Sequence, residues 1–271
     1  GLELRLDAAF LNRAPCLRAI ATRTSQLRHI DLDLARERNI EVLRIDPAAP
    51  LLRATSSTAE ETWALLLALV RNIPWAFDSV KAGRWERARY GGHELQGKTL
   101  GLVGFGRLGR MVARYGTAFD MRVLATDPKL APGTTVDGVV AATLEELLAE
   151  SDAVSLQCTY SEATRGLLGE AHFARMKPSA LFVNTARGEI TDEHALLRAL
   201  EEGRIAGAAI DTLAGEGPDG EHLAGNALVE YARSHENLIV VPHLGGATVE
   251  ATERTQLFIS RELIAFLKRA G

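Results

Sequence analysis

The sequence predicts an α/β fold, a doubly wound and mostly parallel sheet with helices on both faces. Three observations support this prediction. From about residue 95 onward, segments typical of buried strands alternate with segments of helical periodicity. A glycine-rich turn joins the first of these strands to the first helix. Several strands are followed directly by charged or polar residues, which a parallel sheet gathers at one edge.

The bulk composition is that of an ordinary globular protein. Of 271 residues, 46% are hydrophobic and 24% are charged, and the length allows two domains. A net charge of −4 is too small to favour a nucleic-acid or anionic-membrane partner. Apolar runs such as residues 64–70 fall far short of the roughly 20 residues of a membrane span.

Cysteine usage and the first residues favour a cytoplasmic location. Cys16 and Cys158 form no CxxC pair and adjoin no histidine-rich cluster, so neither a disulfide framework nor a metal site is predicted. The opening GLELRLDAAF lacks the basic stretch and apolar block of a secretory signal.

The first part of the chain also alternates between strand and helix. We expect a short strand in LRAIATRT, a helix over 32–38 and a strand in IEVLRI. A long helix is expected over about 58–73, with Ser57 as its N-cap and Glu60 completing a capping box.

The remainder reads as a regular series of strands and helices. The expected strands are TLGLVGFG, MRVLATD, DAVSLQC, ALFVNTA, IAGAAID and NLIVVPH. The expected helices are RLGRMVARYGTAF, LEELLAES, HALLRALEEG and a closing helix over about 250–269.

The glycine-rich turn has the spacing of a dinucleotide-binding (Rossmann) motif. Gly104 permits a tight turn, Gly106 lets a pyrophosphate approach the backbone, and Gly109 lets the helix pack closely on the strand. The helix N-terminus supplies unpaired N–H groups and partial positive charge. Asp127 ends the next strand, where a carboxylate binds ribose hydroxyls and repels a 2′-phosphate, so NAD is predicted rather than NADP.

Three residues that follow strands have the chemistry of hydride transfer at an alcohol carbon. That reaction needs an acid or base of near-neutral pKa, and His243 follows the last strand. A carboxylate would orient the imidazole, and Glu216 is the best candidate. Arg187 offers a planar, charged fork for a substrate carboxylate and a polarised carbonyl.

The sequence resembles the D-isomer-specific 2-hydroxyacid dehydrogenase family. The segments that carry the resemblance are GKTLGLVGFGRLGRMVA, LFVNTARGEITDEHALLRALEEGRIAGAAIDTLAGE and NLIVVPHLGGAT. It implies that Arg187 binds the substrate carboxylate and carbonyl, that Glu216 pairs with the imidazole, and that His243 is the acid/base. ALVEYARSHEN is similar to phosphoglycerate-dehydrogenase-like members.

The resemblance also implies further cofactor contacts. It places Asp211 near the nicotinamide carboxamide, with Arg107 and Leu108 along the pyrophosphate. The remaining predicted cofactor-binding residues are Thr159, Thr185, Ala186, Gly245 and Gly246.

By the same resemblance, the chain comprises two domains. Residues 55–247 form the dinucleotide-binding domain, and residues 1–54 with 248–271 form a smaller flavodoxin-like substrate domain whose first strands and helices are missing. The implied partners are a small 2-hydroxy or 2-oxo acid and a second copy of the chain, bound through the nucleotide domain.

Two segments depart from the family pattern. Gln157-Cys158-Thr159-Tyr160-Ser161 replaces the frequent His-x-Pro-Leu-Thr, and Thr22-Arg23-Thr24-Ser25-Gln26 replaces a glycine-rich, carboxylate-binding loop. Two alternatives to a hydroxyacid dehydrogenase therefore stay open. One is a regulatory or scaffolding protein that binds NAD(H), and the other is an NAD-dependent dehydrogenase with a substrate outside the hydroxy acids.

Overall fold

The chain divides into two compact units in the computed structural model, which describes residues 4–24, 27, 29–46, 49–217 and 220–270. Unit 1 comprises Gly1–Thr55, Glu216–His222 and Gly246–Gly271, and unit 2 comprises Ser56–Gly215 and Leu223–Gly245. Among the described residues, no helix is both long and apolar enough to cross a bilayer.

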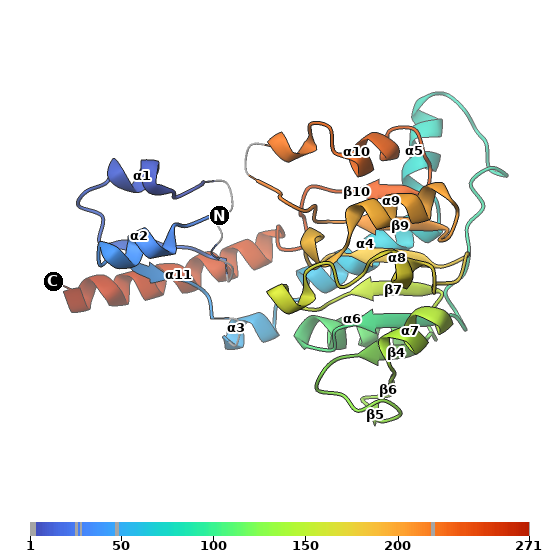
Figure 1. Cartoon of the computed structure of the whole chain (residues 1–271), viewed down its shortest axis with the longest axis horizontal. Helices are drawn as coiled ribbons and strands as arrows, with labels where there is room; N and C mark the ends of the chain where they lie inside the picture. The colour runs from blue at the N-terminus through green and yellow to red at the C-terminus, as the bar shows by residue number, and fades with distance from the viewer. Residues whose placement is uncertain (1–3, 25–26, 28, 47–48, 218–219, 271) are drawn as a thin grey trace. The chain divides into compact units, whose positions relative to one another are not determined.

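Unit 2 is built on an eight-stranded sheet. The strands in chain order are β3 (Thr99–Val103), β4 (Arg122–Thr126), β5 (Thr135–Val136), β6 (Val139–Ala141), β7 (Ala153–Leu156), β8 (Leu181–Asn184), β9 (Gly207–Ile210) and β10 (Leu238–Val240). Their order in the sheet is β10-β9-β8-β7-β3-β4-β6-β5, and every pairing is parallel except that of β5 with β6 (Figure 1). The predicted doubly wound fold is therefore confirmed.

The order of strands reverses at β3. This strand pairs with β4 on one side and with β7 on the other, so the chain builds the two halves of the sheet outward from β3. Ligands of open α/β sheets bind at such a switch point, beyond the carboxyl ends of the strands. The glycine-rich turn follows β3 directly and thus lies at that point.

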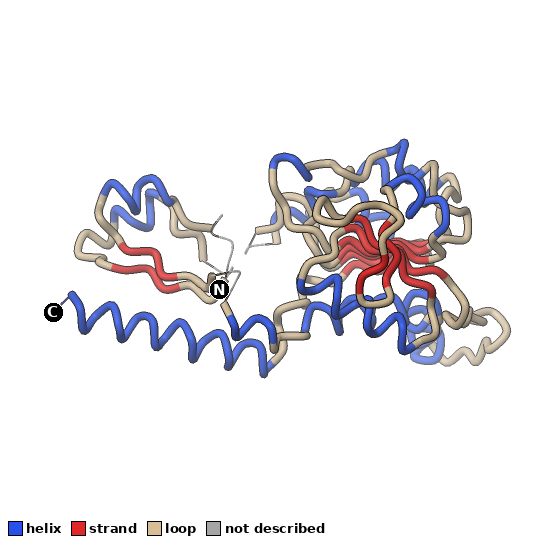
Figure 2. The backbone as a smooth tube through the Cα atoms, turned by 90° about the horizontal axis from the view of Figure 1, so that it is seen from below, coloured by secondary structure: helices blue, strands red, loops and turns tan. Residues whose placement is uncertain are grey.

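Helices cover both faces of this sheet (Figure 2). One apolar core joins the sheet to α4 (Ser57–Val70) and α6 (Arg107–Ala118). The other joins it to α7 (Leu144–Glu150), α8 (Glu170–Phe173), α9 (Glu193–Glu201) and α10 (Ala227–Ala232). Successive side chains of a strand point to opposite faces of the sheet and so enter different cores. Val123 belongs to the first core and its neighbour Leu124 to the second.

The helix expected over about 58–73 is α4, which ends at Val70, three residues earlier than expected. A separate helix that was not predicted, α5 (Ile73–Lys81), begins after Asn72, whose φ of 55° is incompatible with a continuous helix. The predicted N-cap is also wrong. Ser56 is the N-cap and its hydroxyl donates to Glu60 Oε1 at 2.5 Å, whereas the hydroxyl of Ser57 is buried without a hydrogen-bond partner.

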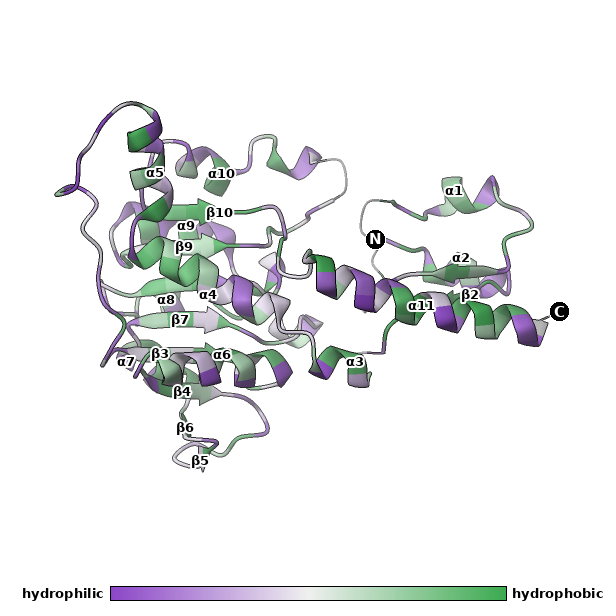
Figure 3. Cartoon of the chain, turned by 180° about the vertical axis from the view of Figure 1, so that it is seen from behind, coloured by the Kyte–Doolittle hydropathy of each residue, from purple (hydrophilic) through white to green (hydrophobic). Residues whose placement is uncertain are grey.

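Unit 1 contains a two-stranded parallel sheet and four α-helices within its described residues. β1 (Ala19–Ala21) pairs with β2 (Glu41–Leu43), and the helices are α1 (Ala8–Asn12), α2 (Leu32–Glu37), α3 (Pro50–Arg53) and α11 (Val249–Ala270). α11 packs against β1 and β2, and apolar and polar residues alternate along it (Figure 3). Leu11, Ile20 and Ile40 belong to the small core of this unit.

Candidate active site

The glycine turn after β3 combines a tight backbone with open space. Gly104 has a φ of 104°, and a Cβ there would lie 2.6 Å from the backbone nitrogen of Cys158. A Cβ at Gly109 would lie 2.3 Å from the carbonyl oxygen of Gly104, so the helix start and the strand end touch. At Gly106, by contrast, a Cβ would meet no heavy atom within 4 Å. The backbone is thus tightly packed at Gly104 and Gly109, and the space beside Gly106 is open, which fits a bound pyrophosphate.

Gly106 is the N-cap of α6, and the first turn of this helix contains no acidic residue. The unpaired N–H groups there favour an anion. The side chain of Arg107, the first residue of α6, is half-buried, and this burial lowers its pKa, although the guanidinium remains charged at neutral pH.

Asp127 lies beside this turn. Its Oδ2 accepts a hydrogen bond from the backbone N–H of Phe105 at 2.9 Å, and its Oδ1 accepts one from that of Lys129 at 3.0 Å. The carboxylate is thus oriented by the glycine turn itself. Each oxygen has a second lone pair with which it could accept a ribose hydroxyl.

Asn184, the last residue of β8, shapes the turn that contains Arg187. Its side chain is buried, accepts a hydrogen bond from the N–H of Ala186 at 2.9 Å and donates to the carbonyl of Arg187 at 3.0 Å. Gly188 packs so closely that a Cβ would lie 2.1 Å from the backbone nitrogen of Ala214. The half-buried Arg187 therefore projects from a turn that is fixed on both sides.

The loop after β10 is fixed by Asp211, the residue that follows β9. The buried carboxylate of Asp211 accepts hydrogen bonds from the N–H groups of Leu244 at 2.6 Å and Gly245 at 3.0 Å. The N–H of His243 donates to the Asp211 carbonyl at 2.9 Å. His243 has a φ of 54°, an unfavourable conformation for a non-glycine residue that these hydrogen bonds hold in place.

A buried polar cluster lies between α4 and the ends of β7 and β8. The hydroxyls of Thr62 and Thr185 are 2.7 Å apart, and Gln157 Nε2 donates to Ser155 Oγ at 2.9 Å and to Thr62 Oγ1 at 3.2 Å. The sequence analysis singled out Gln157 and Thr185 but missed Thr62. Thr62 could have been identified as a polar residue on the buried, otherwise apolar face of a helix.

Two ionisable groups near this edge have shifted pKa values. Burial, reinforced by the nearby Asp211 carboxylate, raises the pKa of Glu61 on α4. Burial also raises the pKa of the Cys158 thiol to about 11, with a smaller contribution from Asp127. Cys158 is therefore protonated and unreactive at neutral pH.

Most of the predicted site residues belong to unit 2, at the carboxyl edge of its sheet. They are Gly104, Gly106, Arg107, Leu108, Gly109, Asp127, Thr159, Thr185, Ala186, Arg187, Asp211, His243 and Gly245. Thr159 is exposed, and its carbonyl accepts a hydrogen bond from the Thr164 hydroxyl at 3.0 Å. Glu216 and Gly246 belong to unit 1, and Ser25 and Gln26 of the altered loop lie outside the described residues.

Residues 63–245 match the family model described as the D-isomer specific 2-hydroxyacid dehydrogenase, NAD binding domain. The chain belongs to this family. The predicted Rossmann domain is thereby confirmed.

Individual relatives of the family cover nearly the whole chain. D-3-phosphoglycerate dehydrogenase of Rattus norvegicus is 37% identical over 265 residues, which are 97% of this chain and 47% of the relative. The chain thus spans about half the length of that curated relative. Glyoxylate reductase of Thermococcus gammatolerans is 36% identical over 98% of this chain and 78% of its own length.

A solved member of the family has the same fold over most of its length. The D-lactate dehydrogenase from Aquifex aeolicus, crystallised with NAD and lactic acid, matches with a TM-score of 0.78 and 33% identity. The match covers 97% of this chain and 80% of that enzyme.

Proposed function

We propose that this protein transfers a hydride between NAD and C2 of a small D-2-hydroxy acid or the corresponding 2-oxo acid. The observation that carries the proposal is the convergence of three fixed loops at one sheet edge. The loop after β3 is an anion-binding glycine turn, the loop after β8 contains Arg187, and the loop after β10 contains His243. Family membership supports the same chemistry.

The residues of the glycine turn fit a dinucleotide. Gly104, Gly106 and Gly109 with the N-terminus of α6 would hold the pyrophosphate, and Asp127 would accept the ribose hydroxyls. The resemblance supports Arg107, Leu108, Thr159, Thr185, Ala186, Asp211, Gly245 and Gly246 as further contacts. The bound cofactor supplies the hydride acceptor or donor.

The protein side chains bind the acid and move its proton. The Arg187 guanidinium would bind the substrate carboxylate and carbonyl through paired hydrogen bonds. His243 would take the hydroxyl proton during oxidation and return it during reduction. Glu216 would pair with the imidazole and favour its protonated form. In this proposal, unit 2 is the cofactor-binding domain and unit 1 is the substrate-binding domain.

A panel of 2-oxo acids tests this function. Glyoxylate, hydroxypyruvate, pyruvate and phosphohydroxypyruvate are each mixed with NADH and the protein, and loss of NADH absorbance is followed. At least one acid should be reduced, and Arg187→Gln should raise its KM and lower kcat. Tight NADH binding without reduction of any 2-oxo acid would support the alternative, a regulatory or scaffolding protein that binds NAD(H).

We further propose that unit 2 forms a homodimer through α5 and the segment after it. Ile73, Phe77 and Val80 follow helical spacing on one exposed face of α5, and Trp85 is 85% exposed. An exposed apolar face of this kind is typical of a protein–protein interface.

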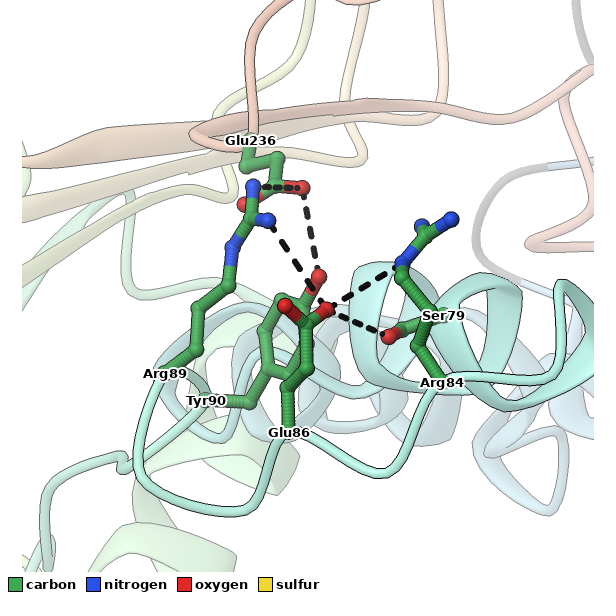
Figure 4. A network of polar contacts seen from close by, with 6 residues as sticks. All are labelled: Ser79, Arg84, Glu86, Arg89, Tyr90 and Glu236. Carbon is green, nitrogen blue, oxygen red and sulfur yellow. Dashed lines mark hydrogen bonds and ion pairs between the residues drawn. The ribbon is translucent and has the colours of Figure 1, made fainter.

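Polar contacts hold this surface in a defined conformation (Figure 4). Glu86 accepts hydrogen bonds from Ser79 Oγ at 2.9 Å and Arg84 Nε at 3.2 Å. Arg89 donates to Glu236 at 3.0 Å, which ties the segment to the turn before β10. An ordered surface loses little conformational entropy on association, so it is suited to a stable partner.

Light scattering tests the dimer. Phe77→Glu should convert a dimeric wild-type protein into a monomer, because it introduces a charge at the centre of the apolar face. Leu267→Glu, at an exposed apolar position of α11, is the control and should leave the mass unchanged. A wild-type monomer, or an unchanged mass for Phe77→Glu, would contradict this assignment.

A further inference from the structure

Two threonines one turn apart on α4 contact two different loops of the site. Thr58 Oγ1 donates a hydrogen bond to the carbonyl of Gly245 at 3.0 Å. Thr62 Oγ1 lies 2.7 Å from Thr185 Oγ1. Gly245 is two residues after His243, and Thr185 is two residues before Arg187.

The Thr62 hydroxyl has three polar neighbours. It lies 2.8 Å from the carbonyl of Thr58, to which it can donate, and 2.7 Å from the Thr185 hydroxyl, where either oxygen can be the donor. Gln157 Nε2 donates to Thr62 Oγ1 at 3.2 Å.

Burial makes this arrangement specific. Thr62 and Thr185 are 1% and 4% exposed. A buried hydroxyl that loses its partner costs about 1–3 kcal/mol, so the satisfied cluster disfavours other positions of the two segments. The N-terminal turns of α4 thus link the loop after β8 to the loop after β10.

Each loop is also anchored to its own strand. Asn184 fixes the turn of Arg187, and Asp211 fixes the loop of His243. The two anchors are themselves joined through the sheet, because the Asp211 N–H donates to the Asn184 carbonyl at 2.9 Å. The contacts of Thr58 and Thr62 add a second connection, since they tie both loops to one helix, α4. Both threonines, both loops and both anchors belong to unit 2.

We propose that Thr58 and Thr62 are positioning residues that hold the loops of Arg187 and His243 at the separation required for hydride transfer. This inference rests on the proposed function. Positioning errors of about 1 Å can reduce turnover about 100-fold, so small displacements of these loops would be measurable in kcat.

The first test is steady-state kinetics of Thr62→Val and Thr58→Val with the best 2-oxo acid of the panel. Valine keeps the shape of threonine and removes the hydroxyl. Each variant should lower kcat about 10-fold to 100-fold, while Kd for NADH changes less than about threefold. Thr62→Ser keeps the hydroxyl and should restore most of kcat. The double variant should be little worse than the poorer single variant, because both residues hold the same separation.

The matched control is Thr117→Val. The Thr117 hydroxyl donates to the carbonyl of Ala113 at 3.1 Å inside α6, the same intrahelical bond that Thr62 makes in α4. This control should keep wild-type kcat, and its thermal midpoint shows what the loss of such a bond costs at an exposed position of a helix.

The second test, amide hydrogen exchange, does not depend on turnover. Residues 185–188 and 243–245 should exchange faster in Thr62→Val than in Thr117→Val. Unchanged exchange in both segments would overturn the inference whether or not any 2-oxo acid is reduced. Faster exchange with wild-type kcat would also overturn it. If the panel shows no reduction while exchange rises as expected, the proposed function fails, and with it the catalytic purpose of the linkage.

Discussion

Two glycines of one turn should respond in opposite ways to the same substitution. Gly104→Ala places a methyl group in a backbone with a φ of 104° and 2.6 Å from the nitrogen of Cys158. Gly106→Ala places it where no heavy atom lies within 4 Å. The first change should therefore lower the stability of the fold, and the second should weaken binding of the cofactor.

The magnitudes follow from these geometries. At Gly104, backbone strain of about 1–3 kcal/mol adds to overpacking of about 1–3 kcal/mol. A loss of about 2–6 kcal/mol should lower Tm by at least about 4 °C in a chain of this size. At Gly106, Tm should change by less than about 2 °C, but the methyl group occupies the space expected for the pyrophosphate. An overlap cost of about 1–3 kcal/mol there raises Kd for NADH roughly 5-fold to 150-fold.

Thermal unfolding and NADH fluorescence titration of both variants give the result. Wild-type affinity in Gly106→Ala would refute the assignment of the pyrophosphate to this turn. An unchanged Tm in Gly104→Ala would refute the close contact between the turn and the end of β7.

Three further results are expected. Asp127→Ala should lower the preference for NADH over NADPH by about 10-fold or more, because a hydrogen bond from the ribose to a charged group is lost. The preference is measured as the ratio of the two kcat/KM values, and an unchanged ratio would exclude the ribose contact. At pH 8, a thiol reagent should label the exposed Cys16 rapidly and Cys158 slowly, since a pKa of about 11 leaves about one thiolate in a thousand. Because burial raises the pKa of Glu61, its ionised form destabilises the fold above the pKa of the unfolded chain, about 4.3. Glu61→Gln should thus raise Tm more at pH 7 than at pH 4, and the reverse trend would contradict this.

Local sequence patterns predicted the features of the fold that depend on neighbouring residues. The glycine spacing at 104–109 predicted a strand, a turn and a helix, and the structure contains β3, the turn and α6 there. The capping residue of α4 was misplaced by one position because the serines at 56 and 57 are both suitable N-caps. The hairpin of β5 and β6 went unpredicted, although Asp137-Gly138, both with positive φ, is a typical two-residue hairpin turn.

The parts of the candidate site that were missed depend on tertiary contacts. Asn184 was not singled out, and Asp211 was predicted as a cofactor contact but not as the anchor of the loop of His243. Neither residue type at a strand end specifies such a backbone partner. Thr58 and Gly245 are 187 positions apart in the sequence, so periodicity within α4 could not predict their hydrogen bond. The break between α4 and α5 had a local signal that was not used, because Asn72 can adopt the left-handed conformation and Pro74 favours the first turn of a new helix.

The most direct test of the proposed chemistry is the turnover of His243→Ala with the best 2-oxo acid and NADH. Our account predicts that kcat falls at least about 100-fold, the usual contribution of a general acid, while Kd for NADH stays within about threefold of the wild-type value. Wild-type turnover in this variant would show that another group moves the proton.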